Sequence, residues 1–439
     1  MLSIACKFAH LNHKPMLEIQ YIRENPESVK AGLERKFFKN TGLVDDIIHL
    51  DALRRQTQQE LDETLAESNR LAKEIGNLFK QGKAAEANSA KARSGELKQE
   101  SKKWQDKLHQ VEEQLHLALV ELPNLPHHSV PPGRNAEDNE VVHAEGEVYT
   151  SETLIPHWEL ADRFKLIDFD LGSKITGAGF PVYRGKGARL QRALINFFLE
   201  EGIKAGYEEY QPPLLVNEDS GFGTGQLPDK EGQMYHIGLD NLYLIPTAEV
   251  PVTNFYRDVI LKESDFPVKN VAYSSCFRRE AGSYGKDVRG LNRLHLFDKV
   301  EIVQISHPDH SYPVLEEMRA HVESLLRKLN LPYRVLNLCG GDISFTSAKT
   351  YDMEVWSAGQ QRWLEVSSVS NFESFQSNRM KLRFKTTEGK TRLAHTLNGS
   401  ALALPRIMAA LLENNFDGTQ IHIPVVLQAY TGFKAIGPE

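Results

Sequence analysis

Residues 276–301 read CFRREAGSYGKDVRGLNRLHLFDKVE, and this stretch does most to decide the fold. Both ends carry apolar residues typical of β-strands, and the polar middle carries three glycines. We therefore predict two neighbouring strands joined by a glycine-rich loop. Arg278 and Arg293 then extend from neighbouring strands, and a guanidinium group matches the oxygens of phosphates and carboxylates. An exposed hairpin with surface ion pairs would have a similar composition, so this stretch alone leaves the function open.

The sequence around this hairpin indicates an α+β domain. Short strand-like runs at 242–245, 271–273 and 300–303 alternate with helical segments such as 188–201 and 313–329. Neighbouring strands with segregated helices are typical of an antiparallel sheet packed against helices, and we place this domain at residues 161–439.

Near its end, the chain combines a strand, the run Asn398-Gly399-Ser400 and an amphipathic helix that contains Arg406. The N-terminus of a helix attracts anions, and a nearby arginine strengthens such a site. The alternative is a buried helix whose arginine pairs with a carboxylate.

A different architecture precedes this domain, because residues 37–122 contain no proline and carry two heptad patterns. Apolar or small residues alternate at steps of four and three in both series: Leu61, Leu65, Ser68, Ala72, Ile75 and Phe79, then Leu97, Ser101, Trp104, Leu108, Val111, Leu115 and Ala118. Gly82 lies between the two series and marks a turn. The pattern predicts an antiparallel helical hairpin, or arm, over about residues 43–119, with helices ~55 Å long.

Charge is distributed unevenly between this arm and the whole chain. The 439 residues carry a formal net charge of −7, whereas residues 80–107 hold eight basic and four acidic residues, an excess of +4. An acidic protein does not coat nucleic acid through bulk charge, so any RNA contact must be local, and the basic end of the arm suits phosphate binding. The alternative is a solvated coiled-coil surface without a ligand.

The composition excludes several other classes of protein. With 41% hydrophobic and 25% charged residues the chain is globular. It contains no apolar run near the ~20 residues of a membrane span. Its three cysteines are not in C-x-x-C spacing, so we expect neither a disulfide framework nor a cysteine zinc site, and we expect a reducing, cytoplasmic location.

Two further segments complete the expected organisation. Residues 1–15 read as a disordered or mis-started extension, with Met16 as the alternative start, and residues 16–122 form the region of the helical arm. Residues 123–160 are rich in proline, histidine and acid, so we expect a linker. Its adjacent His127 and His128 do not share a helix face and are not expected to bind metal.

Together and in this order, these segments resemble the class II aminoacyl-tRNA synthetases, and specifically the seryl-tRNA synthetase family. The resemblance covers residues 16–439, arm included. Residues 277–301 resemble the second motif of the class, residues 187–213 its first motif, and Arg406 the arginine of its third. There are two departures from the family pattern: Arg279 stands where a small residue is frequent, and Pro405 stands where glycine is frequent.

The resemblance implies that serine and ATP form seryl-adenylate and that serine is then transferred to tRNA(Ser), with selenocysteine tRNA as a further candidate acceptor. It implies catalytic roles for Arg278 and Arg406. The implied ATP-binding residues are Arg278, Arg279, Glu280, Arg293, Phe297, Glu365, Val366, Ser367, Ser368 and Arg406. The implied serine-binding residues are Thr247, Ala248, Glu249, Glu301 and Ser400. Glu365 and Ser368 would hold Mg²⁺, which prefers oxygen ligands.

The resemblance also implies partners, and it leaves alternatives open. A homodimer is expected through residues 187–213, although the apolar residues Leu190, Leu194, Phe197 and Phe198 also allow an ordinary core helix. We expect tRNA to bind the arm, and we expect no membrane association. One alternative is a related amino-acid ligase that loads a carrier protein, and such an enzyme should lack a long basic arm. Another is a non-catalytic RNA-binding or scaffold protein, which would usually lose the arginines or the metal-binding carboxylate.

Overall fold

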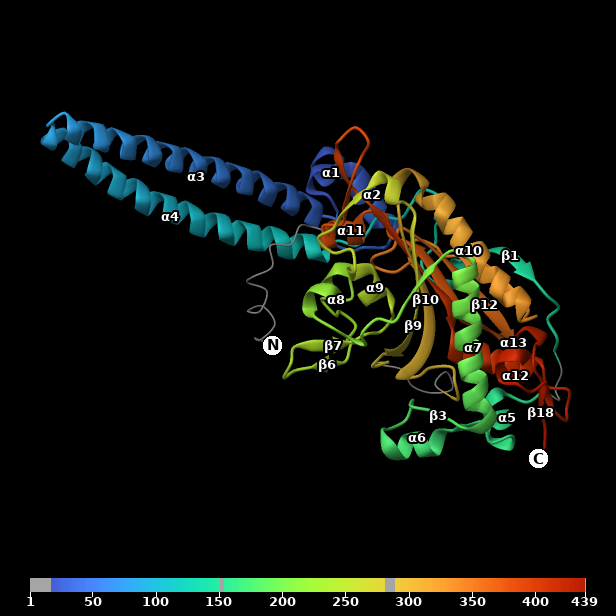
Figure 1. The fold of residues 1–439 in the computed structure, drawn as a ribbon. Helices are drawn as coiled ribbons and strands as arrows, with labels where there is room; N and C mark the ends of the chain where they lie inside the picture. The colour runs from blue at the N-terminus through green and yellow to red at the C-terminus, as the bar shows by residue number, and fades with distance from the viewer. Residues whose placement is uncertain (1–16, 151–153, 281–288, 439) are drawn as a thin grey trace. The chain divides into compact units, whose positions relative to one another are not determined.

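The computed structural model describes residues 17–150, 154–280 and 289–438 (Figure 1). Residues 1–15 and Met16, the expected extension and alternative start, lie outside this described part. The chain divides into two units, one formed by residues 1–34 and 38–123 and the other by residues 35–37 and 124–439. Within the described ranges, no helix is long and apolar enough to span a membrane.

The N-terminal unit is helical. Its helices are α1 (Ile19–Glu24), α2 (Pro26–Arg35), α3 (Leu43–Lys80) and α4 (Ala84–Glu121). α3 and α4 lie side by side and run antiparallel (Figure 1). The turn between them contains Gly82, whose φ of 76° lies in the left-handed region that favours glycine. The predicted helical hairpin is thus confirmed.

The seam on α4 follows the predicted heptad pattern. Leu97, Val111 and Leu115 are buried, and the intervening positions Ser101, Trp104 and Leu108 are half-buried. The seam therefore alternates at the predicted steps of four and three along this helix.

The seam on α3 differs from the prediction at every second position. Leu61 is buried as predicted, but Leu65 is 38% exposed and Phe79 is 51% exposed. The inward positions are displaced by one residue, from Leu65, Ala72 and Phe79 to Thr64, Leu71 and Leu78. Thr64 can occupy the seam because its hydroxyl donates to the main-chain carbonyl of Glu60 at 2.7 Å, which satisfies the buried polar group.

An eight-stranded sheet forms the core of the second unit (Figure 1). Its strands, in spatial order, are β1 (Glu140–Glu145), β11 (Tyr333–Asn337), β12 (Lys349–Ser357), β13 (Arg362–Asn371), β16 (His395–Ala403), β10 (Leu296–Ser306), β9 (Val268–Phe277) and β4 (Glu208–Tyr210). Neighbouring strands are antiparallel except β4 and β9, which are parallel. β9 and β10 are the strands predicted from residues 276–301, and Phe277 pairs with Leu296 at their ends. The α+β class is confirmed.

Most of the segment expected to be a linker, residues 123–160, belongs to this unit. β1 pairs with β11 at one edge of the sheet, and α5 (His157–Arg163) buries Leu160 and Ala161 in the core. The side-chain amide of Asn124 donates to the carbonyls of Thr346 and Phe372, both at 2.9 Å. The segment has the composition of a linker, but main-chain pairing and a few apolar residues hold it in the fold.

Different helices cover the two faces of the sheet. α7 (Gly185–Lys204), α10 (Ser311–Lys328) and α12 (Leu404–Asn414) pack on the face where Val300 and Ile302 are buried. α9 (Glu249–Asn254) and α11 (Phe375–Met380) contribute to a separate cluster with Val303 and Ile305. Because side chains alternate along a strand, Val303 and Ile305 face away from the cluster that buries Val300 and Ile302.

α7 lies in the segment expected to form a homodimer interface. Its apolar residues Leu190, Leu194, Phe197 and Phe198 are each at most 2% exposed and pack in the main core. A dimer contact in this segment therefore has to use other residues, such as those of the edge strand β4.

Smaller elements surround the sheet. Further helices are α6 (Phe169–Ile175), α8 (Glu218–Thr224) and α13 (Val425–Thr431). Small sheets are formed by β2 (Ile167–Asp168) with β3 (Val182–Tyr183); by β5 (Leu215–Val216), β7 (Leu242–Leu244) and β6 (His236–Ile237); by β15 (Thr391–Leu393), β14 (Arg383–Lys385) and β8 (Ile260–Lys262); and by β17 (Ile421–His422) with β18 (Ala435–Ile436).

Candidate active site

A pocket of about 500 Å³ opens on the face of the sheet opposite α7, α10 and α12. Phe297, Lys299 and Glu301 line it together because they are alternate residues of β10. Ser400 of β16 pairs with Glu301 across the two strands and also lines the pocket. The remaining walls come from β12, β13, the first turns of α9 and α12 and the segments between strands.

One part of the pocket is a small polar site around Glu301. The Glu301 carboxylate, 2% exposed, lies 2.6 Å from the Lys299 ammonium and accepts a hydrogen bond from the Thr247 hydroxyl at 3.2 Å. Glu249 lies two residues after Thr247 and accepts a hydrogen bond from the side-chain amide of Gln376 at 2.7 Å. Buried polar groups of this kind suit a small polar ligand that supplies matching donors and acceptors.

Glu249 lies where ionisation is unfavourable. Burial raises the pKa of Glu249 to about 7, and the nearby charge of Glu301 adds to the effect. The hydrogen bond from Gln376 and the charges of Lys299 and Arg278 offset this increase only in part. A cationic ligand group beside Glu249 would neutralise the carboxylate, so the site favours an ammonium group.

A second part of the pocket gathers arginines around an aromatic ring. The Arg278 guanidinium lies 5.1 Å from the centre of the Phe297 ring, and its Nε donates to the carbonyl of Pro246 at 3.4 Å. Arg293 Nε lies 2.6 Å from the carboxylate of Glu280. This combination of cations and an aromatic face suits a ligand with a flat ring and anionic groups.

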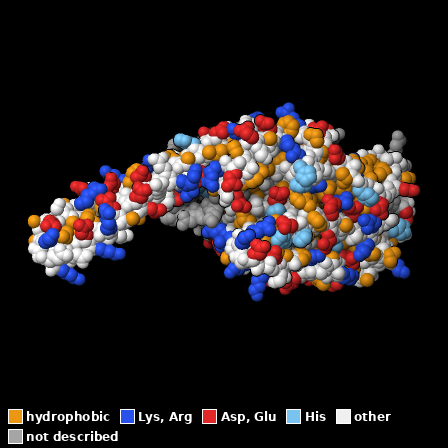
Figure 2. Space-filling model, turned by 90° about the horizontal axis from the view of Figure 1, so that it is seen from above, with side chains coloured by type: hydrophobic (Ala, Val, Ile, Leu, Met, Phe, Trp, Pro, Cys, Tyr) orange, Lys and Arg blue, Asp and Glu red, His pale blue; other side chains and the backbone are white. Residues whose placement is uncertain are grey.

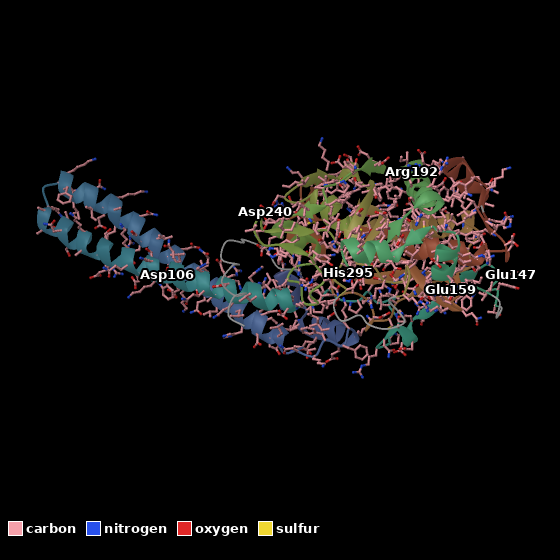
Figure 3. The ribbon with its side chains drawn as sticks, turned by 90° about the horizontal axis from the view of Figure 1, so that it is seen from below. Asp106, Glu147, Glu159, Arg192, Asp240 and His295 are labelled. Carbon is pink, nitrogen blue, oxygen red and sulfur yellow. The ribbon has the colours of Figure 1, made fainter. Side chains whose placement is uncertain are left out.

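His295, labelled in Figure 3, does not line the pocket but contacts the segment that carries Arg278. Its main-chain carbonyl accepts from the Arg278 main-chain N–H at 3.0 Å, and its Nδ1 lies 3.0 Å from the Tyr235 hydroxyl. The ring of His295 stacks on Phe180 with 5.3 Å between ring centres. These contacts fix the main chain that carries Arg278.

Arg406 lies in the first turn of α12, directly after Pro405. Its Nη1 donates to the main-chain carbonyl of Glu365 at 2.7 Å and lies 3.6 Å from the Glu365 carboxylate. Its Nε donates to the main-chain carbonyl of Asn292 at 3.1 Å. Pro405 is compatible with the helix because the first turn requires no main-chain donor at this position. The side chain thus pairs with a carboxylate, as the alternative interpretation expected, and is still 32% exposed in the pocket.

Two carboxylates and a hydroxyl lie on the adjacent strands β12 and β13. Asp352 pairs across these strands with Ser368, and Glu365 is on the same strand as Ser368. Burial, and then the charge of Glu365, raise the pKa of Asp352 well above its usual range. Asp352 Oδ1 is buried and has no hydrogen-bond partner. A buried carboxylate oxygen without a partner, next to a second carboxylate, fits a hard divalent cation such as Mg²⁺.

The pocket brings together most of the predicted site residues. Its lining includes Thr247, Glu249, Arg278, Glu280, Arg293, Phe297, Glu301, Glu365, Val366, Ser367, Ser368, Ser400 and Arg406. Ala248 is not part of the lining, because it packs with Val252 and Val303 in a separate buried cluster. Arg279 is not part of it either, because successive residues of an extended chain point to opposite sides, and its charge lies near Tyr235.

Asn292, Lys299 and Asp352 are among the pocket residues that were not predicted. Lys299 could have been found, because it lies two residues from both Phe297 and Glu301 on a predicted strand. Asp352 has a weaker signal, since residues 350–355 alternate polar and apolar side chains, as a strand with one polar face does.

Comparison with known proteins identifies the family. Residues 16–126 match the family described as "Seryl-tRNA synthetase N-terminal domain", and residues 235–415 match "tRNA synthetase class II core domain (G, H, P, S and T)". A serine–tRNA ligase from Salinibacter ruber is 51% identical over 428 residues, which cover 97% of this chain and 100% of that protein. The chain belongs to the seryl-tRNA synthetase family. A serine–tRNA ligase from Akkermansia muciniphila is 48% identical and covers 97% of this synthetase and 100% of its own length.

Solved structures agree with this assignment. The crystal structure of seryl-tRNA synthetase from Pyrococcus horikoshii complexed with ATP has a TM-score of 0.90 and 34% identity, covering 96% of this synthetase and 100% of that chain. The crystal structure of the cytoplasmic serine–tRNA ligase from Naegleria fowleri in complex with AMP has a TM-score of 0.86 and 26% identity. The match covers 97% of this synthetase and 99% of that chain. The synthetase therefore shares its fold with both over nearly the whole chain, and the family resemblance drawn from the sequence is confirmed.

Proposed function

We propose that this synthetase joins L-serine to ATP as seryl-adenylate and then transfers serine to tRNA(Ser). The observation that carries this proposal is one pocket that holds a small buried carboxylate site at Glu249 and Glu301 and a cationic site at Arg278, Arg293 and Arg406. The first suits the ammonium group of an amino acid, and the second suits a triphosphate.

The first step is attack of the serine carboxylate on the α-phosphorus of ATP, with pyrophosphate leaving. Such phosphoryl chemistry depends on positioning and charge stabilisation more than on a strong base. We assign Arg278 to bridge the serine carboxylate and the α-phosphate. This assignment is supported by its position, since Arg278 lines the same pocket as both Phe297 and Glu249 and its charge lowers the pKa of Glu249.

The nucleotide is held, in this proposal, by the residues of the arginine-rich part. Phe297 stacks on the adenine ring, Glu280 accepts from the adenine amino group, and Arg293 and Arg406 bind the triphosphate. Glu280 and Arg293 pair with each other at 2.6 Å, and the Arg278 guanidinium lies over the Phe297 ring. ATP therefore has to exchange these internal contacts for contacts of its own, and this exchange limits the net gain in affinity.

Serine is selected by the small polar site. Thr247, Glu249, Glu301 and Ser400 are assigned to the amino group and the side-chain hydroxyl. A site built to hydrogen-bond a hydroxyl discriminates by about 10⁴–10⁵ against an analogue that lacks it, so alanine and glycine are rejected without editing. Lys299 supports this site by pairing with Glu301, which keeps the carboxylate in place.

Glu365, Ser368 and Asp352 are the residues that would hold Mg²⁺. Asp352 Oδ1 lacks a hydrogen-bond partner, and its neighbour Glu365 supplies a second carboxylate. Among the described residues, no group of three or more His, Cys, Asp and Glu side chains is placed to hold a metal ion by itself, so water and substrate oxygens would complete the coordination, as is usual for Mg²⁺. When bound, the ion supplies charge neutralisation for the triphosphate.

The arm is proposed to bind tRNA(Ser), and also selenocysteine tRNA, through phosphate contacts. α3 and α4 bury each other's seams, so the hairpin needs no further partner for its core. The long basic arm argues against the alternative of a ligase for a carrier protein. The presence of Arg278, Glu365 and Arg406 argues against a non-catalytic scaffold.

We further propose that the synthetase is a homodimer, which a mass measurement by light scattering tests. We also propose a cytoplasmic location, in keeping with the reduced, buried Cys276 and Cys339.

The deciding experiment is amino-acid-dependent ATP–pyrophosphate exchange, measured with each of the twenty amino acids. We expect exchange with serine only. Arg278→Ala should abolish it while the fold stays intact, because the variant loses an interaction with the reacting phosphate. Arg257→Ala, which removes an arginine outside the pocket lining, serves as the control and should keep near-normal exchange. Exchange with another amino acid, or normal exchange by Arg278→Ala, would contradict the proposal.

A further inference from the structure

Residues 289–293, called the stem here, lead into the ATP part of the proposed site and are held from outside the pocket. Leu291 is 1% exposed and Asn292 is 5% exposed. Asn292 accepts the hydrogen bond from Arg406, and Arg293 follows it directly in the chain. The position of this short segment therefore sets the geometry of two arginines of the site.

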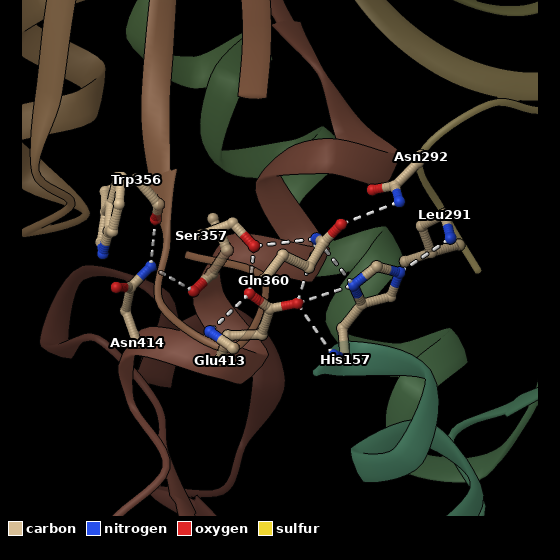
Figure 4. Close-up of polar contacts among 10 residues, drawn as sticks. His157, Leu291, Asn292, Trp356, Ser357, Gln360, Glu413 and Asn414 are labelled. Carbon is tan, nitrogen blue, oxygen red and sulfur yellow. Dashed lines mark hydrogen bonds and ion pairs between the residues drawn. The ribbon is translucent and has the colours of Figure 1, made fainter. Parts of the chain in front are cut away.

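A buried histidine–glutamate pair contacts the stem (Figure 4). The side chains of His157, at the start of α5, and Glu413, near the end of α12, are fully buried, and His157 Nδ1 lies 2.8 Å from the Glu413 carboxylate. The main-chain N–H of Leu291 donates to His157 Nε2 at 2.8 Å. Because this N–H can only donate, Nε2 carries no proton, and Nδ1 is the nitrogen that donates to Glu413.

The Glu413 carboxylate is itself fixed by several donors. It accepts from the main-chain N–H groups of His157 at 2.9 Å and Gly359 at 3.1 Å, and from the hydroxyl of Ser357. Burial disfavours its ionisation, but the hydrogen bonds from His157 and Ser357 outweigh burial, and the pKa of Glu413 is lowered. The Glu413 carboxylate thus holds the His157 imidazole in one orientation.

The stem is linked to both ends of α12. Arg406, in the first turn, donates to the Asn292 carbonyl, and Glu413, near the last residue, acts through His157 on Leu291. A third link comes from the Asn292 side-chain amide, which donates to Gln360 Oε1 at 2.9 Å (Figure 4). The main chain just before Arg293 is thus fixed at successive residues.

Packing around His157 leaves little room for another arrangement. A Cβ atom on Gly290 would lie 2.3 Å from His157 Nε2, which is a steric clash. The φ of Gly290 is +68°, a main-chain conformation that also disfavours any residue with a side chain. The Arg289 guanidinium lies 4.8 Å from the centre of the ring of Trp158, the residue after His157. The first two residues of α5 therefore contact three consecutive residues of the stem.

We propose that His157 is a positioning residue for ATP binding: oriented by Glu413, its Nε2 holds Leu291 and Asn292 so that Arg293 and Arg406 are presented to the triphosphate. The inference rests on the proposed roles of those two arginines in ATP binding. His157 does not line the pocket. Its loss should therefore weaken ATP binding while serine binding stays nearly unchanged.

Two amide variants separate the two bonds of the imidazole. In His157→Asn the side-chain amide takes the place of Nδ1, so the bond to Glu413 can persist while the acceptor for Leu291 is lost. In His157→Gln the amide reaches the place of Nε2, so its oxygen can accept from Leu291 while the bond to Glu413 is lost. The proposal attributes ATP binding to the hydrogen bond that the acceptor at the place of Nε2 takes from the Leu291 N–H. Only His157→Asn should therefore bind ATP more weakly.

The test measures KM for ATP and for serine separately by pyrophosphate exchange, and hydrogen–deuterium exchange at the Leu291 amide. For His157→Asn we expect KM for ATP to rise about 5- to 10-fold, the loss of one hydrogen bond, with KM for serine within about twofold. The Leu291 amide should exchange faster by a similar factor. For His157→Gln both quantities should stay within about twofold of the parent protein.

The control is His395→Asn, which changes another largely buried histidine, hydrogen-bonded through Nδ1 to Ser311 at 2.8 Å, that shares no partner with His157. It should leave KM for ATP unchanged. If His157→Asn fails to fold, Gly290→Ala, whose methyl group displaces the same contact, should raise KM for ATP instead.

Several results would overturn the inference: equal effects of the asparagine and glutamine variants, a matching rise in KM for serine, or an unchanged Leu291 amide. A parent protein without serine-dependent exchange would overturn the proposed function instead. The amide measurement needs no substrate, so it still tests the His157 contact in that case.

Discussion

At the residue scale, Glu249 lies where a carboxylate is unfavourable until a cation binds. Burial, and then Glu301, raise the pKa of Glu249 to about 7, whereas a glutamate in an unfolded chain titrates near ~4.3. Between these values the folded protein binds more protons than the unfolded chain. The contribution of Glu249 to stability is therefore present at low pH and is lost as the pH rises toward 7.

Glu249→Gln should consequently stabilise the ligand-free protein at pH 8 and have little effect at pH 5. The glutamine mimics the protonated carboxyl, and the expected difference between the two pH values is about 2–3 kcal/mol. Calorimetry of the unfolding midpoint at both pH values checks this. The same gain at pH 5 and pH 8 would show that packing, not ionisation, is responsible.

Asp352 provides a second prediction at this scale, on the metal. Asp352→Asn should raise the Mg²⁺ concentration needed for half-maximal exchange by roughly tenfold, as the loss of a ligand or its close partner does. The comparison variant is Glu354→Gln on the same strand, whose partner is Arg334 at 2.5 Å and which does not line the pocket. An identical Mg²⁺ titration of Asp352→Asn and the parent protein would remove Asp352 from the proposed metal site.

The predicted site residues that share one strand or one motif lie together in the pocket. Phe297 and Glu301 share a face of β10 by alternation, and Lys299 follows the same rule although it was not predicted. Asp352 could not be paired with Glu365 from the sequence, because their strands meet only through the register of β12 and β13. The role of His157 depends on contacts with residues more than one hundred positions away, which no local pattern reports.

At the scale of elements, the heptad pattern predicted the helices of the arm and their turn, but not which residues of α3 face the seam. Two long helices with a turn at Gly82 follow from the absence of proline and from the periodicity, and the structure has both. The phase on α3 was wrong at alternate positions because Leu65 and Leu71 are equally apolar, and a threonine, Thr64, takes a seam position. Hydrophobicity alone does not distinguish these phases, since a buried threonine can satisfy its hydroxyl within its own helix.

The corrected phase gives a direct prediction. Leu61→Ala, at a position 6% exposed, should destabilise the hairpin by about 2–3 kcal/mol, whereas Leu65→Ala, at a position 38% exposed, should cost under about 1 kcal/mol. Hydrogen–deuterium exchange of the α3 and α4 amides in the full-length protein measures the local effect. Equal destabilisation by both variants would restore the phase expected from the sequence.

At the scale of the whole molecule, net charge and local charge have opposite signs. The chain carries −7 overall, yet residues 80–107 carry an excess of +4. Basic and acidic side chains are interspersed along the arm (Figure 2), and Asp106 is one of the acidic residues on α4 (Figure 3). Arg93 is engaged with Glu67 at 3.4 Å and Glu96 at 3.2 Å. Lysines such as Lys98, Lys102 and Lys103 are therefore the better candidates for binding phosphates.

Replacing residues 43–119 by a short Gly/Ser linker should separate the two half-reactions. Exchange of pyrophosphate with serine and ATP should survive, because every residue assigned to that step belongs to the second unit. Charging of tRNA should collapse because the tRNA no longer binds.

A milder variant combines Lys98→Gln, Lys102→Gln and Lys103→Gln. It should lower the slope of log tRNA affinity against log salt concentration by up to about two or three, because each lost lysine neutralises roughly one phosphate less. Arg93→Gln, which removes a charge already paired with carboxylates, should change that slope less. If the linker variant charges tRNA with an unchanged KM, the arm does not bind tRNA, and its lysines form only a solvated surface.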